Sequence, residues 1–258
     1  MSSCITSCSS CPSKNVCTIK NEESGPSEIQ KKFMNKKVFG VMSGKGGVGK
    51  STISASLALQ MSKIKKTCII DADIAGPSIA RATGVESSQF IAGKLIPSRT
   101  EALDVFTPED KENAHTKGME ILQYLSSIDV DEYEAVVIDT PPGTSDIHIA
   151  LAKHIPNINI ILVSTPHKLS IADTNRQISF CSKTGLKIVG LVENMSGYTC
   201  GNCQFVVPVH RTAQLEGVPE DVPRIAVPMC QDIAKESDHG VAKSVTQYMN
   251  ISQLKIFN

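Results

Sequence analysis

One segment constrains the fold of this chain more than any other, the octet GKGGVGKS at 44–51. The apolar run Val38–Met42 precedes it and a helical pattern over Lys50–Lys63 follows it. This is the GxxxxGK[ST] pattern of a phosphate-binding loop between a strand and a helix. Its glycines let the backbone curl so that N–H groups point at phosphate oxygens, and the helix N-terminus adds partial positive charge. The alternative is a glycine-rich turn that matches by chance, which this context disfavours.

The loop predicts a nucleotide with a bound magnesium ion. Lys50 is expected to reach the β- and γ-phosphates, and the Ser51 hydroxyl to ligate Mg²⁺. The residues expected to contact ATP or Mg²⁺ in this loop are Gly44, Lys45, Gly46, Gly47, Val48, Gly49, Lys50, Ser51 and Thr52.

Short apolar runs alternate with helical stretches along the rest of the body. Most of the runs are continuous rather than alternating, as in parallel strands that are buried on both faces. The pattern predicts a doubly wound, mainly parallel α/β sheet with ligands at the carboxyl ends of its strands. The expected strands are 37–42, 67–70, 102–106, 135–138, 158–163, 188–192 and 224–227, and the expected helices are 50–63, 116–127, 145–154, 169–184 and 240–249.

Acidic residues follow two of the expected strands. A P-loop ATPase needs an acidic residue at a strand end to hold hydrated Mg²⁺, and Asp139 ends the run 134–138. In the turn that follows, Gly143 would let the backbone approach a γ-phosphate. Asp71 and Asp73 follow a second run, 68–70. For either residue taken alone, the less favoured alternative is a turn that caps the next helix.

Composition limits the classes of partner. Lys plus Arg equals Asp plus Glu at 26 each, which argues against a nucleic-acid coat or a polybasic membrane binder. No run approaches the ~18 apolar residues of a membrane span, and residues 1–8 show neither the basic nor the apolar region of a signal peptide. We therefore expect a cytosolic chain, where thiols stay reduced.

The nine cysteines then call for another explanation than disulfides. Thiolates bind Zn²⁺ or iron–sulfur clusters, and four complete either kind of site. We expect residues 1–35 to form a flexible tail whose cysteines suffice for one site, with a short helix at Glu28–Met34. We expect residues 36–258 to form the ATPase domain. The tail cysteines are Cys4, Cys8, Cys11 and Cys17.

Cys200 and Cys203 make a CxxC pair, which is half a site. Only His210 follows soon after as a further ligand. Two chains related by a two-fold axis would supply four thiolates to one bridging [4Fe–4S] cluster. Cys68 and Cys181 lie in apolar patterns typical of core residues, Cys230 is ambiguous, and the six histidines form no metal-binding motif.

The octet, with its additional Lys45, resembles the deviant Walker A motif of the MinD/ParA/ArsA ATPases (SIMIBI class). DADIAGPS at 71–78, DTPPGTSD at 139–146 and ENMSG at 193–197 with the CxxC resemble the Mrp-like branch, whose members scaffold and carry iron–sulfur clusters. The resemblance covers about residues 37–245. It implies that Lys45 acts on the facing nucleotide across a dimer, that Asp71 lies near Mg²⁺, that Asp73 orients the attacking water, and that Asn194 lies beside the adenine.

The tail is similar to the N-terminal cluster site of the larger eukaryotic cytosolic scaffold subunit. This resemblance implies one [4Fe–4S] cluster per tail and another that bridges two chains. It also implies a homodimer, or a heterotetramer with a shorter paralogue, that serves apo iron–sulfur proteins and targeting factors in the cytoplasm, with the nucleus as a second compartment.

Three functions remain open on the sequence. The first is a cluster scaffold and carrier with weak ATPase activity at Lys45, Lys50 and Asp73. The second is a MinD/ParA-like positioning ATPase, which would need a basic amphipathic end, whereas Val245–Asn258 has one lysine. The third is a zinc-dependent regulatory NTPase.

Overall fold

The computed structural model describes residues 27–109, 118–209 and 218–254. The tail cysteines Cys4, Cys8, Cys11 and Cys17 therefore lie outside the described residues. Eleven strands are described: β1 (Lys37–Ser43), β2 (Thr67–Asp71), β3 (Gln89–Ile91), β4 (Lys94–Ile96), β5 (Ser98–Arg99), β6 (Asp104–Phe106), β7 (Ala135–Asp139), β8 (Asn159–Ser164), β9 (Lys187–Thr199), β10 (Val206–Pro208) and β11 (Arg224–Met229).

Nine of the described strands form one sheet in the order β10-β9-β8-β1-β7-β2-β6-β5, with β11 paired to β9. The pairs from β9 to β6 and the β11–β9 pair are parallel, while β10 and β5 pair antiparallel at the two ends of that order. The remaining two strands, β3 and β4, form a separate hairpin. The predicted doubly wound, mainly parallel α/β fold is confirmed.

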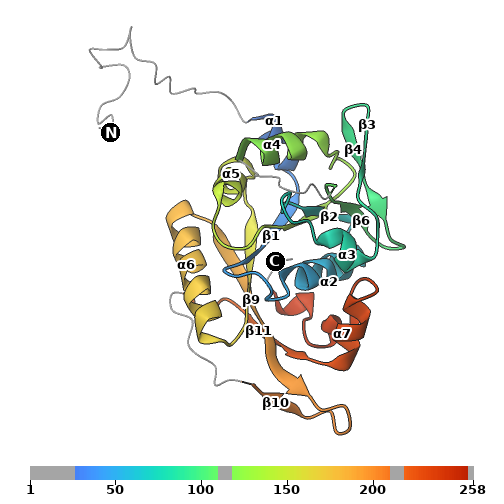
Figure 1. Ribbon diagram of the computed structural model, residues 1–258. Coiled ribbons are helices and arrows are strands. Elements are labelled where there is room, and N and C mark those ends of the chain that lie inside the picture. The colour runs from blue at the N-terminus through green and yellow to red at the C-terminus, as the bar shows by residue number, and fades with distance from the viewer. Residues whose placement is uncertain (1–26, 110–117, 210–217, 255–258) are drawn as a thin grey trace, which may run out of the picture.

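Helices cover both faces of this sheet (Figure 1). They are α1 (Glu28–Phe33), α2 (Lys50–Ser62), α3 (Ile79–Thr83), α4 (Gly118–Ser127), α5 (Asp146–His154), α6 (Lys168–Thr184) and α7 (Gln231–Ser237), followed by the 3₁₀ segments η2 (Lys243–Gln247) and η3 (Ile251–Gln253). The predicted helices that correspond to α1, α2, α4, α5 and α6 are confirmed.

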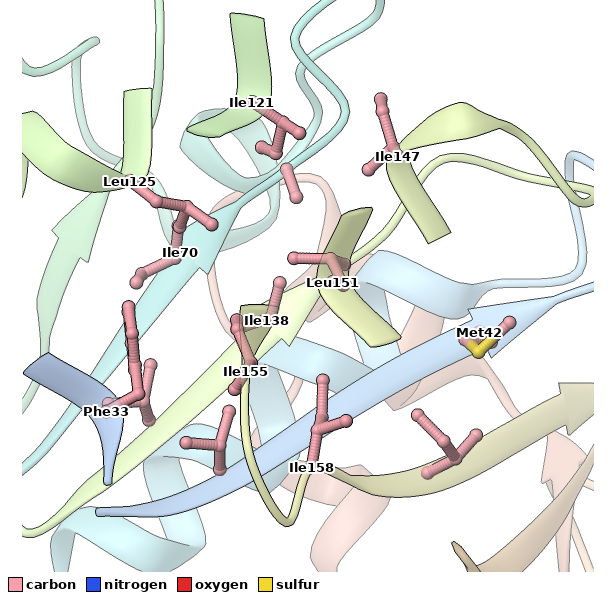
Figure 2. Packing of buried hydrophobic residues seen from close by; sticks show 14 of the residues in the cluster. Phe33, Met42, Ile70, Ile121, Leu125, Ile138, Ile147, Leu151, Ile155 and Ile158 are labelled. Atoms are coloured by element: carbon pink, nitrogen blue, oxygen red, sulfur yellow. The ribbon is translucent and has the colours of Figure 1, made fainter. Parts of the chain in front are cut away.

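The core consists of two apolar clusters, one on each face of the sheet. Strand β1 contributes to both, because successive side chains point to opposite faces: Val38 and Met42 belong to one cluster, and Phe39 and Val41 to the other. Figure 2 shows the first cluster, in which helices α1, α4 and α5 direct side chains at strands β2, β7 and β1. The strands are thus buried on both faces, which explains their continuous apolar sequences.

The predicted helix over 240–249 is wrong. Gly240 has φ +144, and the segment after it forms two short 3₁₀ turns, η2 and η3. The Glu236 carboxylate accepts hydrogen bonds from the N–H and the hydroxyl of Ser244, which ties this segment to α7. Its apolar residues Val245 and Met249 pack against the α2 side of the sheet. Helix α7 was not predicted, because it has no buried face to produce an apolar period.

Helix α1 changes the predicted boundary of the tail. Ile29 is 8% exposed and Phe33 is fully buried, and Figure 2 shows Phe33 among the core residues beneath α4. Ser27 begins the helix with a capping box to Gln30. The assumption that residues 1–35 add little to the core therefore fails for α1, and the packed domain begins near Ser27.

We expect truncation to distinguish the two boundaries. A chain that starts at residue 27 should keep the unfolding free energy of the full chain, whereas one that starts at residue 36 should lose about 3–5 kcal/mol, as on removing a buried Phe side chain. The full chain with Phe33→Ala should lose a similar amount. Urea denaturation followed by circular dichroism measures all four proteins. Equal stability of the two truncated chains would show that α1 is not part of the core.

Candidate functional site

The predicted nucleotide residues meet at one edge of the sheet. Strands β1, β7 and β2 are neighbours and parallel, so their carboxyl ends lie together. The GKGGVGKS loop follows β1, and Asp139 and Asp71 are paired residues at the ends of β7 and β2. In doubly wound sheets, ligands bind at the carboxyl ends of the strands, at the point where the strand order reverses.

The glycine-rich loop is built to receive an anion. Gly47 has φ +77 and Gly49 has φ +83, a left-handed region that favours glycine. Gly49 caps the N-terminus of α2. No N–H group of Gly44–Gly49 donates a hydrogen bond to another described residue. The loop therefore presents several N–H donors beside a helix N-terminus. A phosphate group bound there would accept hydrogen bonds from these donors.

Lys50 lies at the bottom of the loop, 7% exposed. Its ammonium group pairs with Asp139 at 2.6 Å between Nζ and Oδ2. The same carboxylate accepts hydrogen bonds from the hydroxyls of Ser51 (2.7 Å) and Ser54 (2.5 Å). The structure thus brings Lys50, Ser51 and Asp139 together. Ser54, which also contacts Asp139, was missed because it lies outside the motif. Thr52 is half-buried in the first turn of α2.

Asp71 is fully buried and organises the loop after β2. Its carboxylate accepts hydrogen bonds from the N–H groups of Asp73, Ser78 and Ile79. Two of these N–H groups lie at the start of α3, so the helix-capping contact that the sequence offered as an alternative is present. Burial, together with the nearby Asp139 carboxylate, raises the pKa of Asp71 to about 7. A cation at this edge would stabilise both carboxylates.

Asp73 is more accessible than Asp71. It is half-exposed, and its Oδ1 accepts a hydrogen bond from the Gly76 N–H at 3.2 Å. Partial burial raises the pKa of the Asp73 carboxyl, and the positive charge of Lys50 opposes that rise. The carboxylate is thus placed at the rim of the site, where a water molecule can reach it.

The loop after Asp139 is held by contacts that the sequence did not reveal. Gly143, at φ +75, donates its N–H to the Ser43 carbonyl at 2.8 Å. His148 of α5, 1% exposed, receives the Ser145 N–H at Nδ1 and lies 3.2 Å from the Thr140 hydroxyl at Nε2. With Nδ1 acting as acceptor, the neutral ring donates from Nε2. His148 matches no histidine motif, and only the fold shows its role.

The buried position of His148 has a consequence for acid stability. Burial, with a smaller effect of Lys50, lowers the pKa of His148 from 6.5 to about 4. A lowered pKa means that the folded protein binds fewer protons than the unfolded chain between these values. Its contribution to stability is therefore complete above pH 6.5 and is lost as the pH falls toward 4, with a magnitude of about 3 kcal/mol.

His148→Gln should remove that pH dependence. We expect the loss of unfolding free energy between pH 7 and pH 4.5 to be about 2 kcal/mol smaller in this variant than in the unsubstituted protein. His239→Gln is the matched control, because His239 is exposed. Urea denaturation at a series of pH values measures the difference. Parallel pH profiles for the two variants would contradict the assignment.

Lys45 and Asn194 differ in their exposure and in their contacts with the loop. Lys45 is exposed and forms no ion pair with another described residue, so its ammonium group is available to a facing molecule. Asn194 of β9 is 9% exposed, and its amide donates to the Val48 carbonyl at 2.8 Å. A Cβ atom on Gly49 would collide with this amide. The place of Asn194 beside the adenine stays a prediction. In the structure, Asn194 contacts the backbone of the phosphate loop.

The CxxC pair lies at the tip of the β9–β10 hairpin, which extends away from the body at the end opposite α4 (Figure 1). Cys203 is exposed and Cys200 is partly exposed. The pKa of Cys200 is lowered, first by the N–H of Cys203, then by the N–H of Asn202 and the Cys203 thiol. A turn that directs N–H groups at a sulfur favours the thiolate, which is the metal-binding form.

No described His, Cys, Asp or Glu residues form a group of three that could hold a metal ion. The hairpin therefore presents two thiols without a third ligand from the described part of its own chain, and His210 lies outside it. Cys68 and Cys181 are buried, as predicted for core residues, and Cys230 caps α7 with its sulfur.

The comparison with known families decides the affiliation of the chain. A family model described as ParA, NUBPL iron-transfer P-loop NTPase, matches residues 34–258. The chain belongs to this family. The predicted resemblance to the Mrp-like iron–sulfur branch of the MinD/ParA ATPases is thereby confirmed.

Relatives within and around this family agree with the assignment. The chain is 35% identical over 228 residues to an iron-sulfur cluster carrier protein of Methanocaldococcus jannaschii, covering 81% of this chain and 78% of the relative. It is 38% identical over 210 residues to the human cytosolic Fe-S cluster assembly factor NUBP2, covering 69% and 75%.

Solved structures show the same fold. An Archaeoglobus fulgidus nucleotide-binding protein in complex with ADP superposes with a TM-score of 0.70 at 27% identity, covering 89% of this chain and 96% of the other. The septum site-determining protein MinD of Pyrococcus horikoshii, complexed with Mg-ADP, gives 0.60 at 20% identity, covering 86% and 93%. Among the described residues, no helix has the length and apolar character needed to cross a membrane.

Proposed function

We propose that this protein is a scaffold and carrier of iron–sulfur clusters whose ATP binding and weak ATPase activity control the cluster. One observation carries the proposal: strand β9 contacts the nucleotide loop through Asn194 and then runs to Cys200 at the tip of the hairpin. At about 3.3 Å per residue, the two sites lie about 20 Å apart along one strand.

The nucleotide half of the site fits Mg-ATP. The N–H groups of the loop, which have no acceptor among the described residues, suit phosphate oxygens. Lys50, whose charge is here paired with Asp139, supplies a positive charge for the phosphates. Ser51 and the carboxylates of Asp71 and Asp139 are oxygen ligands of the kind that Mg²⁺ takes, directly or through water. Bound Mg-ATP would supply the phosphoryl group to be hydrolysed, and Asp73 at the rim would position the attacking water.

The cluster half is incomplete in one chain. Cys200 and Cys203 supply two thiolates, and a [4Fe–4S] cluster takes four. A second copy, or the shorter paralogue implied by the sequence resemblance, would supply the other two across a two-fold axis. Exposed apolar side chains on the same hairpin, including Tyr198, Phe205 and Val207, support burial against a partner. We propose that the cluster held there is cargo destined for apo-proteins.

Lys45 links the nucleotide site to the proposed dimer, because its exposed ammonium group would act on the nucleotide of a facing chain. Lys45→Ala is expected to keep its Kd for ATP within about threefold while losing about tenfold or more of its hydrolysis rate. Lys63→Ala, at the exposed end of α2, is the matched control. Nucleotide titration and phosphate release measure the two properties, and normal turnover in Lys45→Ala would exclude the action across the dimer.

The tail adds a second proposed cluster. Cys4, Cys8, Cys11 and Cys17 would hold one [4Fe–4S] cluster in each chain, in the manner of the larger cytosolic scaffold subunit. Targeting factors and apo iron–sulfur proteins would be the partners, and the cytoplasm, with the nucleus as a second compartment, is the proposed location.

Anaerobic reconstitution tests the proposal directly. The full chain is purified without oxygen, incubated with iron and sulfide, and analysed for iron, acid-labile sulfide and zinc. Equal amounts of iron and sulfide, with the near-ultraviolet and visible absorption of a [4Fe–4S] cluster, are expected. Stoichiometric zinc without sulfide would instead support the zinc-dependent NTPase, and absence of both would favour a positioning ATPase.

A further inference from the structure

Gln177 is a buried glutamine of α6, 1% exposed, that contacts two segments of the nucleotide site at once. Its Nε2 amide donates to the Ser43 carbonyl at 2.9 Å and to the Gly143 carbonyl at 3.0 Å. Ser43 is the last residue of β1, directly before the phosphate loop. Gly143 lies in the loop that follows Asp139. One side chain therefore joins the base of the phosphate loop to the loop that would meet a γ-phosphate.

The two carbonyl acceptors fix the orientation of the Gln177 amide, because only its nitrogen can donate to them. Its Oε1 is then buried without a hydrogen-bond partner among the described residues. An unpartnered buried acceptor is unfavourable. The side chain thus keeps an unused acceptor on the same amide that holds the Gly143 carbonyl.

Both polar groups of the Gly143 backbone are engaged in this junction. Its N–H donates to the Ser43 carbonyl at 2.8 Å and its carbonyl accepts from Gln177. A phosphate oxygen can receive the Gly143 N–H only after this N–H has left Ser43. Gly143 can make such a turn, since glycine is permissive in φ and no described atom lies within 4 Å of a Cβ placed there.

Helix α6 provides a fixed support for Gln177. Asp173, one turn earlier, is so close to Gly44 that a Cβ atom on this glycine would lie 2.5 Å from the Asp173 backbone. Thr174 bonds through its hydroxyl to Ser164 at the end of β8, at 2.8 Å. The helix is thus fixed to the phosphate loop and to the sheet.

We propose that Gln177 is a positioning residue that holds the Gly143 loop on β1 when no γ-phosphate is present, and so lowers the affinity for ATP relative to ADP. The inference rests on the proposed ATPase function. When a γ-phosphate takes the Gly143 N–H, the loop leaves Ser43, and the hydrogen bond from Gln177 to the Gly143 carbonyl is lost with that position of the loop.

Gln177→Met tests the proposal, because methionine keeps the volume and removes both donors. Gln60→Met is the matched control: Gln60 is also a buried helical glutamine, with Oε1 bonded to the Ile251 N–H and Nε2 without a partner in the described part of the chain. The measurements are Kd values for ADP and for a non-hydrolysable ATP analogue, and hydrogen exchange of residues 140–146 in nucleotide-free protein.

Gln177→Met is expected to bind the ATP analogue about fivefold to tenfold more tightly, as follows from the loss of one or two hydrogen bonds in the competing state. Its Kd for ADP should stay within about twofold of the value for the unsubstituted protein. Hydrogen exchange of residues 140–146 should be faster in this variant. Gln60→Met should change none of these properties. Gln177→Leu, which is of similar size and has no donor, should shift in the same direction and replaces the methionine variant if that variant does not fold.

Equal changes in the two Kd values would overturn the inference, because a merely structural residue acts on both nucleotides alike. Unchanged exchange of residues 140–146 would overturn it too, even if the protein is an ATPase, since that measurement needs no nucleotide. If the unsubstituted protein binds neither nucleotide, the proposed function itself fails, and the effect on ATP affinity fails with it.

Discussion

Cys200→Ser is expected to abolish the bridging cluster, with a loss of about two iron atoms per chain for one [4Fe–4S] cluster shared by two chains. Serine is a harder and far less acidic ligand than cysteine and holds iron poorly. The dimer would retain two thiolates, both from Cys203. The backbone N–H groups of Asn202 and Cys203, which lower the pKa of Cys200, cannot make a serine hydroxyl acidic enough to replace it.

The experiment uses a chain that begins at residue 27, so that the tail cysteines contribute no iron. Iron, sulfide and sedimentation mass are measured after anaerobic reconstitution. Because a shared cluster binds only the associated chains, it should also stabilise the dimer, and Cys200→Ser should lack this gain. Nucleotide affinity should be unchanged, since the phosphate loop lies elsewhere on the sheet.

Cys230→Ser is the matched control for the cluster. Its sulfur accepts the Ile233 N–H at the start of α7, and serine is a better helix cap than cysteine. This variant should therefore fold normally and keep the full iron content. A stable [4Fe–4S] cluster in Cys200→Ser would contradict a site made of Cys200 and Cys203 from two chains, and its loss on the further change Cys230→Ser would identify Cys230 as a ligand.

Lys50→Met is expected to raise the Kd for ATP on the order of 100-fold, the effect of losing a buried charge-assisted contact to phosphate. Methionine keeps the apolar stem of the side chain. It leaves Asp139 with its hydrogen bonds from Ser51 and Ser54, so the nucleotide-free protein should fold. Isothermal titration and a thermal melt of the same sample measure both properties.

Lys63→Met is the control for this change, since Lys63 is exposed at the end of α2. It should bind ATP normally. Cluster content offers a further readout: because the CxxC hairpin is distant from Lys50, reconstituted Lys50→Met should still hold the bridging cluster. Unchanged ATP affinity in Lys50→Met would refute the assignment of the loop as the phosphate site.

The strength of the local signals explains which elements the sequence predicted. Continuous apolar runs predicted β1, β7 and β8, because strands buried on both faces allow little else. The β3–β4 hairpin was missed, since its strands are short and five of their six residues are exposed. Strand β9 was predicted to end at Val192 but continues to Thr199, because pairing with β11 and β10 extends it beyond its apolar segment.

The sequence by itself determined the phosphate loop, the acidic strand ends and the two-cysteine motif, because each is a short pattern whose chemistry is local. The structure alone decided that His148 and Gln177 hold the loop after Asp139, because these contacts join elements distant in sequence and leave no periodic or motif signal. It also decided that α1 belongs to the core and that one strand connects Asn194 with Cys200. Those features depend on which strands become neighbours, and that is a property of the assembled sheet rather than of any segment within it.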